Sequence, residues 1–133
     1  MNTYQSTNQL FASNMAVYAE PGKPKFINSD YLMEISSGNA EFIEVFLTQF
    51  KEEVKRSLQN LHRQLLCNDF YFMEKTAHAM KPSGVYVGSY SFTLLVSLLE
   101  KAAHEMDKIE VTHLVSQLQS LTENILKEIN EYF

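Results

Sequence analysis

This sequence of 133 residues has a single cysteine, Cys67. A single cysteine excludes an internal disulfide and a cysteine-rich zinc site. Because Cys67 lies in the apolar stretch 65–67, we expect a small core residue rather than a reactive thiol.

Positive charge and long apolar runs are also scarce. The chain has 11 Lys and Arg residues against 16 Asp and Glu, a formal net charge of −5. This balance disfavours nucleic-acid binding, in which contacts to phosphate dominate the affinity. No apolar run approaches the ~18 residues that span a bilayer, and the first residues lack the basic start of a secretion signal. We therefore expect a cytoplasmic protein that binds neither nucleic acid nor a membrane.

The chain divides into a tail and one domain. Its 45% apolar and 20% charged residues are ordinary for a globular protein, and its length suits one core. Residues 1–26 are rich in Asn, Ser and Thr and end near a Pro-Gly-Lys-Pro breaker. They predict an N-terminal tail, in which residues 9–19 can form a short amphipathic helix, followed by a domain over 27–133.

From residue 29 onward, apolar residues recur every three or four positions, which is the period of an α-helix. A short helix capped by Asn28 or Ser29 precedes an apolar stripe of about 27 residues. Three more helices begin after Asp69, near residue 89 and after Asp107. Short connections make successive helices antiparallel, so the sequence predicts an all-α, up-down four-helix bundle with a short preceding helix. The expected core residues of the long helices are Phe42, Ile43, Phe46, Phe50, Val54, Leu58, Leu61, Leu65, Met73, Ala77, Met80, Leu95, Leu98, Leu99, Ala102, Met106, Val111, Leu114, Leu118, Leu121, Ile125 and Ile129.

One stretch, 85–92, is similar to a small β-hairpin with Gly88-Ser89 as its turn. Its arms have only three residues each, and such a hairpin is marginal without further strands. We therefore expect a helix end, a bend and a new helix start.

Residues 76–84 read Thr-Ala-His-Ala-Met-Lys-Pro-Ser-Gly. This resembles the signature of histidine phosphotransfer domains, Ala-His-x-x-Lys-Gly-Ser with a later Gly. His78, Lys81, Ser83 and Gly88 stand where that family places them, and the resemblance covers about residues 27–133. It implies a phosphocarrier of two-component signalling that accepts a phosphoryl group from an aspartyl-phosphate receiver domain onto His78 and passes it to another receiver.

The same resemblance implies what the chain binds. The expected partners are receiver domains of response regulators and a hybrid sensor histidine kinase. The carrier would be a stoichiometric intermediate rather than an enzyme. It would hold no cofactor and no metal, because in this family the Mg²⁺ belongs to the receiver.

The residue types in the motif suit this chemistry. Lys75, His78 and Lys81 are spaced by three, so a helix places them on one face. That face is rotated away from the expected core residues, so the imidazole should lie in solvent. A neutral imidazole is nucleophilic through its unprotonated nitrogen, and Lys81 one turn away can neutralise phosphoryl charge. For Lys75 we expect only an ordinary charged surface position, and Ser83 and Gly88 are expected to serve the helix end and packing.

Glu100 is the third candidate for the site. It lies 22 residues after His78, where the phosphotransfer domains of chemotaxis kinases have a glutamate. By that resemblance it would accept a hydrogen bond from Nδ1–H of His78, fix the tautomer and leave Nε2 free to attack. The alternative is an exposed carboxylate paired with Lys101 or His104.

Pro82 departs from the family pattern, which usually has Gly there. Proline lacks an N–H and crowds the carbonyl four residues back, so we expect a kink or a helix that ends one turn early. Pro82 therefore favours an alternative function, a helical docking module that binds a receiver or another partner without being phosphorylated.

A metal site is the other alternative. Glu110 and His113 form a Glu-x-x-His, half of the motif found in di-iron bundles. The sequence has no second copy, and Glu110 is explained as the capping-box partner of Asp107. His62, His104 and His113 are expected to be surface residues.

Overall fold

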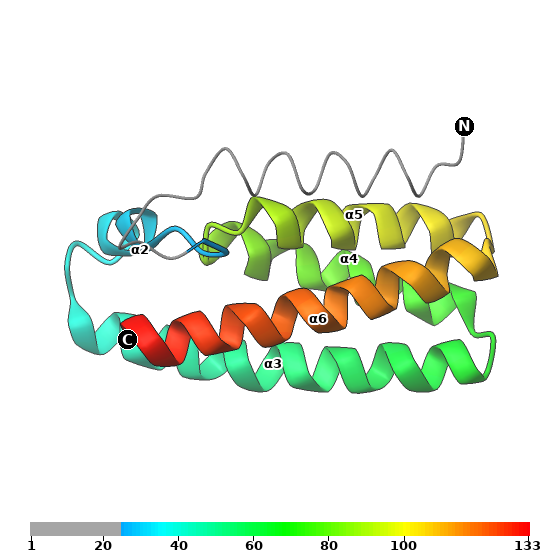
Figure 1. Ribbon diagram of the computed structural model, residues 1–133, viewed down its shortest axis with the longest axis horizontal. Helices are drawn as coiled ribbons and strands as arrows, with labels where there is room; N and C mark the ends of the chain where they lie inside the picture. Colours follow the sequence, from blue (N-terminus) through cyan, green and yellow to red (C-terminus); the bar gives the residue numbers. More distant parts are fainter. Residues whose placement is uncertain (1–24) are drawn as a thin grey trace.

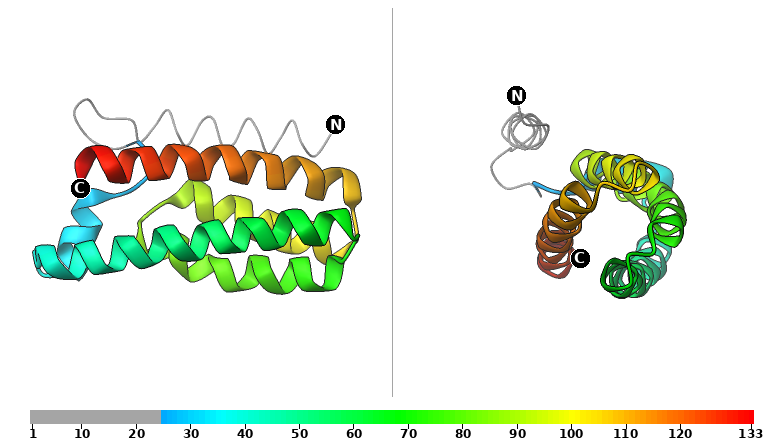
Figure 2. Two further views of the ribbon diagram at one scale, coloured as in Figure 1. Left: turned by 90° about the horizontal axis from the view of Figure 1, so that it is seen from below. Right: turned by 90° about the vertical axis from the view of Figure 1, so that its right-hand side faces the viewer.

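The computed structural model describes residues 25–133, which form a bundle of four long helices with a short helix at one end (Figure 1). In chain order the helices of this part are α2 (Ser29–Ile35), α3 (Ala40–Leu66), α4 (Phe70–Tyr86), α5 (Tyr90–His104) and α6 (Lys108–Tyr132). The end-on view shows α3 to α6 arranged around a common axis (Figure 2). The predicted all-α, up-down bundle with a short preceding helix is confirmed.

The predicted tail falls almost wholly outside the described residues, and so does the short helix predicted at 9–19. The last two residues assigned to the tail, Lys25 and Phe26, are described. Their backbone N–H groups donate hydrogen bonds to the carboxylate of Glu128 on α6. No helix between residues 25 and 133 is long and apolar enough to cross a membrane.

Each helix begins at a polar residue that caps it. The side chains of Asn28, Asn39, Asp69, Ser89 and Asp107 accept hydrogen bonds from the N–H groups at the third position beyond each cap. These bonds satisfy donors that have no partner inside the helix. The capping roles expected of Asn28, Asp69 and Asp107 are confirmed.

Most of the predicted core is buried, and the exceptions lie at helix ends. Met106 is 68% exposed and Phe42 is 48% exposed, so the prediction that they are core residues is wrong. Met106 lies beyond the end of α5 with a positive φ of 54°, where the chain has left the helical path. Phe42 lies one turn before Phe46, whose ring meets Tyr86 at the end of α4 with centroids 5.8 Å apart. Phe42 therefore extends past the helix that would cover it.

Cys67 is a further correction, because it is exposed. It is the C-cap of α3, and the chain turns towards α4 immediately after it. The apolar stretch that suggested burial ends with the helix, so its last residue is on the surface.

The connection between α4 and α5 is a tight turn at residues 87–89, as predicted, and no strand occurs in the described part of the chain. Gly88 has a positive φ of 68°. A Cβ there would lie 2.5 Å from Cβ of Asn28, whose N–H donates to the carbonyl of Val87 at 3.0 Å. The turn therefore depends on a residue without a side chain.

Gly84 allows α4 and α5 to pack closely. A Cβ at this buried position would lie 2.5 Å from Oγ1 of Thr93 and 2.7 Å from Cδ1 of Phe92. We expect Gly84→Ala to lower the free energy of unfolding by about 1–2 kcal/mol, because overpacking outweighs the ~1 kcal/mol gain in helix propensity. Chemical denaturation measures this, with Ser120→Ala on the exposed face of α6 as the control. A Gly84→Ala protein as stable as the wild type would contradict the close packing.

Candidate functional site

His78 projects from α4 into solvent. Its side chain is 73% exposed, while Met73, Ala77 and Met80 are buried on the other face of the same helix. Since the packing of these three residues fixes the rotation of α4 about its axis, the exposure of His78 follows from the core. The ring therefore has the solvent position that the helical spacing predicts.

Glu100 on α5 joins the other two predicted site residues. Its Oε2 lies 2.8 Å from Nδ1 of His78, and its Oε1 accepts a hydrogen bond from Nζ of Lys81 at 3.1 Å. The structure thus brings all three residues together around one carboxylate. With Nδ1–H donating to Glu100, the lone pair of the imidazole is on Nε2, which faces solvent.

The charge state of Glu100 follows from its surroundings. Burial of the carboxyl raises its pKa, and the hydrogen bonds and positive charges of Lys81 and His78 outweigh this effect and hold the pKa below its usual value. Glu100 is therefore ionised at neutral pH. Lys81 offsets that negative charge, which would otherwise oppose an anionic ligand at His78.

Glu100→Gln is expected to shift the tautomer equilibrium of the His78 imidazole. Without the carboxylate, Nδ1–H loses its charged acceptor, and the share of the Nε2–H form rises. Nitrogen-15 NMR of the imidazole measures this directly. An unchanged tautomer ratio in Glu100→Gln would remove the orienting role.

The lowered pKa of Glu100 also gives a pH dependence. A carboxylate with a depressed pKa stabilises the fold above its unfolded-state pKa, and this contribution is lost as the pH falls through the folded-state pKa. Wild type should therefore exceed Glu100→Gln in stability at pH 7, by less than about 1 kcal/mol for so exposed a pair. The difference should vanish in acid, and denaturation curves at both pH values check it.

Pro82 does not end α4. The helix continues through it to Tyr86, so the expectation that it ends one turn early is wrong. Proline removes one backbone hydrogen bond, but Met80 and Gly84 on either side are buried in the bundle. Their packing holds the backbone helical, and Lys81 consequently reaches Glu100.

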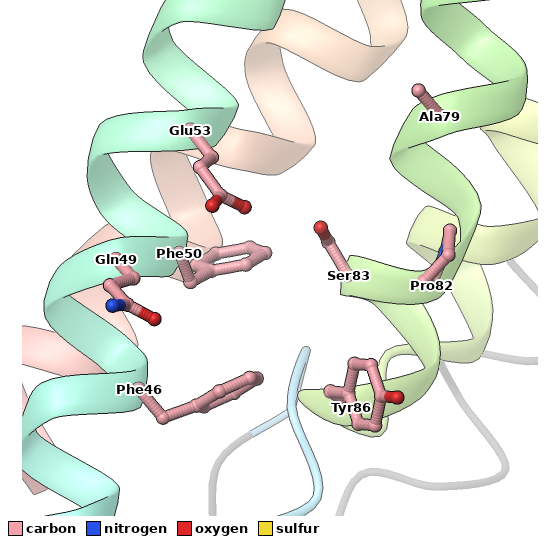
Figure 3. Close-up of a pocket in the computed structure, with 8 residues that line it drawn as sticks. All are labelled: Phe46, Gln49, Phe50, Glu53, Ala79, Pro82, Ser83 and Tyr86. Atoms are coloured by element: carbon pink, nitrogen blue, oxygen red, sulfur yellow. The ribbon is translucent and has the colours of Figure 1, made fainter.

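An exposed stripe on α4 surrounds His78 and consists of Tyr71, Lys75, Ala79, Pro82 and Tyr86. A pocket of about 220 Å³ lies between α3 and α4. Figure 3 shows side chains from the two helices facing each other across this pocket. The lining residues are Phe46, Gln49, Phe50, Glu53, Ala79, Pro82, Ser83 and Tyr86. Two of them, Ala79 and Pro82, lie one and four residues after His78 on α4, while the His78 ring itself turns towards Glu100 on α5 and does not line the pocket.

The aromatic residues near the site differ in their exposure. Tyr71 and Tyr86 are exposed, while Phe70 packs partly against the core. Nζ of Lys75 lies 5.1 Å from the centre of the Tyr71 ring. Lys75 is therefore engaged with an aromatic face rather than with Glu100.

A second histidine–carboxylate pair was missed from the sequence. Nδ1 of His104 on α5 lies 3.1 Å from Oε1 of Glu74 on α4. The signal for it was a repeat, because residues 74–78 and 100–104 both read Glu-Lys-x-Ala-His. The alternative pairing of Glu100 with His104 does not occur, since each glutamate pairs with the histidine of the other helix.

No metal-ligand set supports the di-iron alternative. Within residues 25–133, no three His, Cys, Asp or Glu side chains are grouped so as to hold a metal ion. Glu110 lies instead beside Asp107 at the start of α6. Burial, followed by the negative charges of Asp107 and Glu105, raises the pKa of Glu110.

Comparison with known proteins defines the class of the fold. No family model and no curated protein matches the sequence. The arrangement of helices is similar to that of a histidine-containing phosphotransfer protein. The solved structure that shows this is histidine-containing phosphotransfer protein B (HptB) from Pseudomonas aeruginosa PAO1, with a TM-score of 0.70 over 84% of this chain and 91% of that chain at 19% identity.

Proposed function

We propose that this chain is a histidine-containing phosphocarrier of two-component signal transduction. It accepts a phosphoryl group from the aspartyl phosphate of a receiver domain onto His78 and passes it to another receiver in the cytoplasm. The observation that carries the proposal is an exposed imidazole whose Nδ1 lies 2.8 Å from Glu100. The fold shared with a phosphotransfer protein supports it.

The transfer begins with the neutral imidazole. The lone pair on Nε2 of His78 attacks phosphorus in line, the P–O bond to the receiver aspartate breaks, and the aspartate leaves as a carboxylate. The imidazole then carries a positive charge, which the hydrogen bond from Nδ1–H to Glu100 stabilises. In the return step, the aspartate of a second receiver attacks phosphorus and the P–Nε2 bond breaks.

Lys81 and Glu100 act together in this step. The incoming phosphoryl group is anionic, and the negative charge of Glu100 would repel it. The ammonium of Lys81, which donates to Glu100 at 3.1 Å, offsets that charge. Positioning and charge neutralisation account for most catalysis in such transfers, and the Mg²⁺ that assists would be held by the receiver. The chain is then a stoichiometric carrier without a cofactor of its own.

The stripe around His78 is the face on which a receiver would dock. It presents the exposed aromatic rings of Tyr71 and Tyr86 with small or flat residues, Ala79 and Pro82, next to the imidazole. A hybrid sensor histidine kinase would supply phosphate through its own receiver. Since α4 continues through Pro82, this residue no longer favours a docking module that is not phosphorylated.

The test is incubation of the full chain with a labelled, phosphorylated receiver domain. We expect label on the chain that is lost in acid and retained in base, as for a phosphohistidine. A receiver that binds the chain but never transfers its label, across a panel of candidate receivers, would contradict the proposal.

A further inference from the structure

The two histidine–glutamate pairs on α4 and α5 are arranged alike. His78 of α4 pairs with Glu100 of α5, and four residues along each helix Glu74 of α4 pairs with His104 of α5. The helices are antiparallel neighbours (Figure 1), so an approximate two-fold axis between them exchanges one pair for the other.

His104 has the features that make His78 a candidate nucleophile. Its side chain is 74% exposed, against 73% for His78, and its Nδ1 contacts a carboxylate oxygen at 3.1 Å. With Nδ1–H held by Glu74, the lone pair is on Nε2 in solvent. Lys101, three residues earlier on the same face of α5, supplies a positive charge within one turn.

We propose that His104 is a second phosphoryl-accepting site, one that takes phosphate from small anionic donors such as phosphoramidate. The proposal shares with the proposed function only its chemistry, because the donor here is a small molecule rather than a receiver. In the step, Nε2 of His104 forms a bond to phosphorus, the P–N bond of N-protonated phosphoramidate breaks, and neutral ammonia leaves while the imidazole takes the positive charge. The ring keeps its Nδ1 proton, which donates to Glu74.

His104 should react more slowly than His78. α5 ends at His104, and the residue three positions later is Asp107 rather than a lysine. The C-terminal end of a helix also carries a partial negative charge, which disfavours an incoming anion. Since one preorganised donor contributes on the order of 10²-fold in enclosed sites and less in water, we expect phosphorylation at His104 to be roughly tenfold slower.

The experiment treats full-length variants with phosphoramidate and follows the phosphoryl mass gain by intact mass spectrometry. His78→Gln should still gain a phosphoryl group slowly, and His78→Gln with His104→Gln should gain none. The double variant keeps His62 and His113 as internal controls; both are exposed, and Nε2 of His62 lies 3.0 Å from Oε1 of Gln119. No gain in His78→Gln, or a gain that persists in the double variant, would overturn the proposal.

The Glu74→Gln variant distinguishes a positioning role of Glu74 from a reactivity of His104 that depends on exposure alone. In the His78→Gln background, Glu74→Gln should slow phosphorylation of His104 by about tenfold, in line with the loss of a partner that orients a histidine. In the wild-type background, Glu74→Gln should leave the rate at His78 unchanged. An unaltered rate at His104 would overturn the role of the pair.

Phosphorylation of His78 in His104→Gln concerns the proposed function alone, so failures of the two proposals are distinguishable.

Discussion

His78→Gln is expected to abolish phosphoryl transfer from a phosphorylated receiver domain. Glutamine keeps a polar surface side chain, so the bundle and its docking face remain, but it has no nucleophilic ring nitrogen. His104 cannot replace it in the docked complex. It lies one helical turn beyond Glu100, about 5–6 Å along α5, whereas attack needs the reacting atoms about 3–3.5 Å apart.

Labelled receiver and an electrophoretic assay of both proteins measure this loss. His62→Gln and His104→Gln are the matched controls, because each removes an exposed histidine other than His78, one on α3 and one on α5 a helical turn beyond Glu100. Both should accept label at the wild-type rate. Transfer that survives in His78→Gln would show that another residue is the acceptor.

Phe92→Ala should have the largest effect on stability. Phe92 is 0% exposed and lies edge-on to Phe50 with ring centroids 6.1 Å apart. Truncating a buried phenylalanine costs about 3–5 kcal/mol, since it removes apolar burial and leaves a cavity. Domains of this size have a total stability of only about 5–15 kcal/mol, so the variant should lose a large share of its free energy of unfolding.

Denaturant unfolding of Phe92→Ala and Phe42→Ala makes the comparison within one residue type. Phe42 is 48% exposed, and its removal should cost less than about 1 kcal/mol. Phe92 also packs against Gly84, so it helps to set the spacing of α4 and α5 on which the contact of His78 with Glu100 depends. Equal losses in the two variants would contradict the assignment of the core.

The sequence predicted those parts of the fold that depend on local rules. The period of three or four gave the buried faces of the long helices, and the caps at Asp69 and Asp107 gave two of their starts. Its errors are at helix ends. Periodicity does not show where a helix leaves the bundle, so Met106 and Phe42 were assigned to the core although they lie outside it.

At Pro82, tertiary packing overrides the local tendency of proline to end a helix. Its missing N–H predicts an early end, but the buried side of α4 continues on both sides of it. This tertiary contribution is not visible in the residues adjacent to a proline.

The site was predicted only in part, because its contacts join two helices. The position of His78 on an exposed face follows from the spacing within α4. The contact with Glu100 requires the register of α4 against α5, for which the sequence offered only a family resemblance. Once that register is known, Glu74, four residues before His78 on α4, is expected to lie beside His104, four residues after Glu100 on α5. The repeat marks the two segments in the sequence, but which glutamate pairs with which histidine follows only once the helices are placed.

The central claim is that Glu100 holds Nδ1 of His78 so that Nε2 takes the phosphoryl group. Phosphorus–nitrogen NMR of the chain after transfer from a labelled receiver tests it most directly. The expected result is a single phosphohistidine, at residue 78, with phosphorus bonded to Nε2. Phosphorus on Nδ1 of that ring, or on another residue, would contradict the claim.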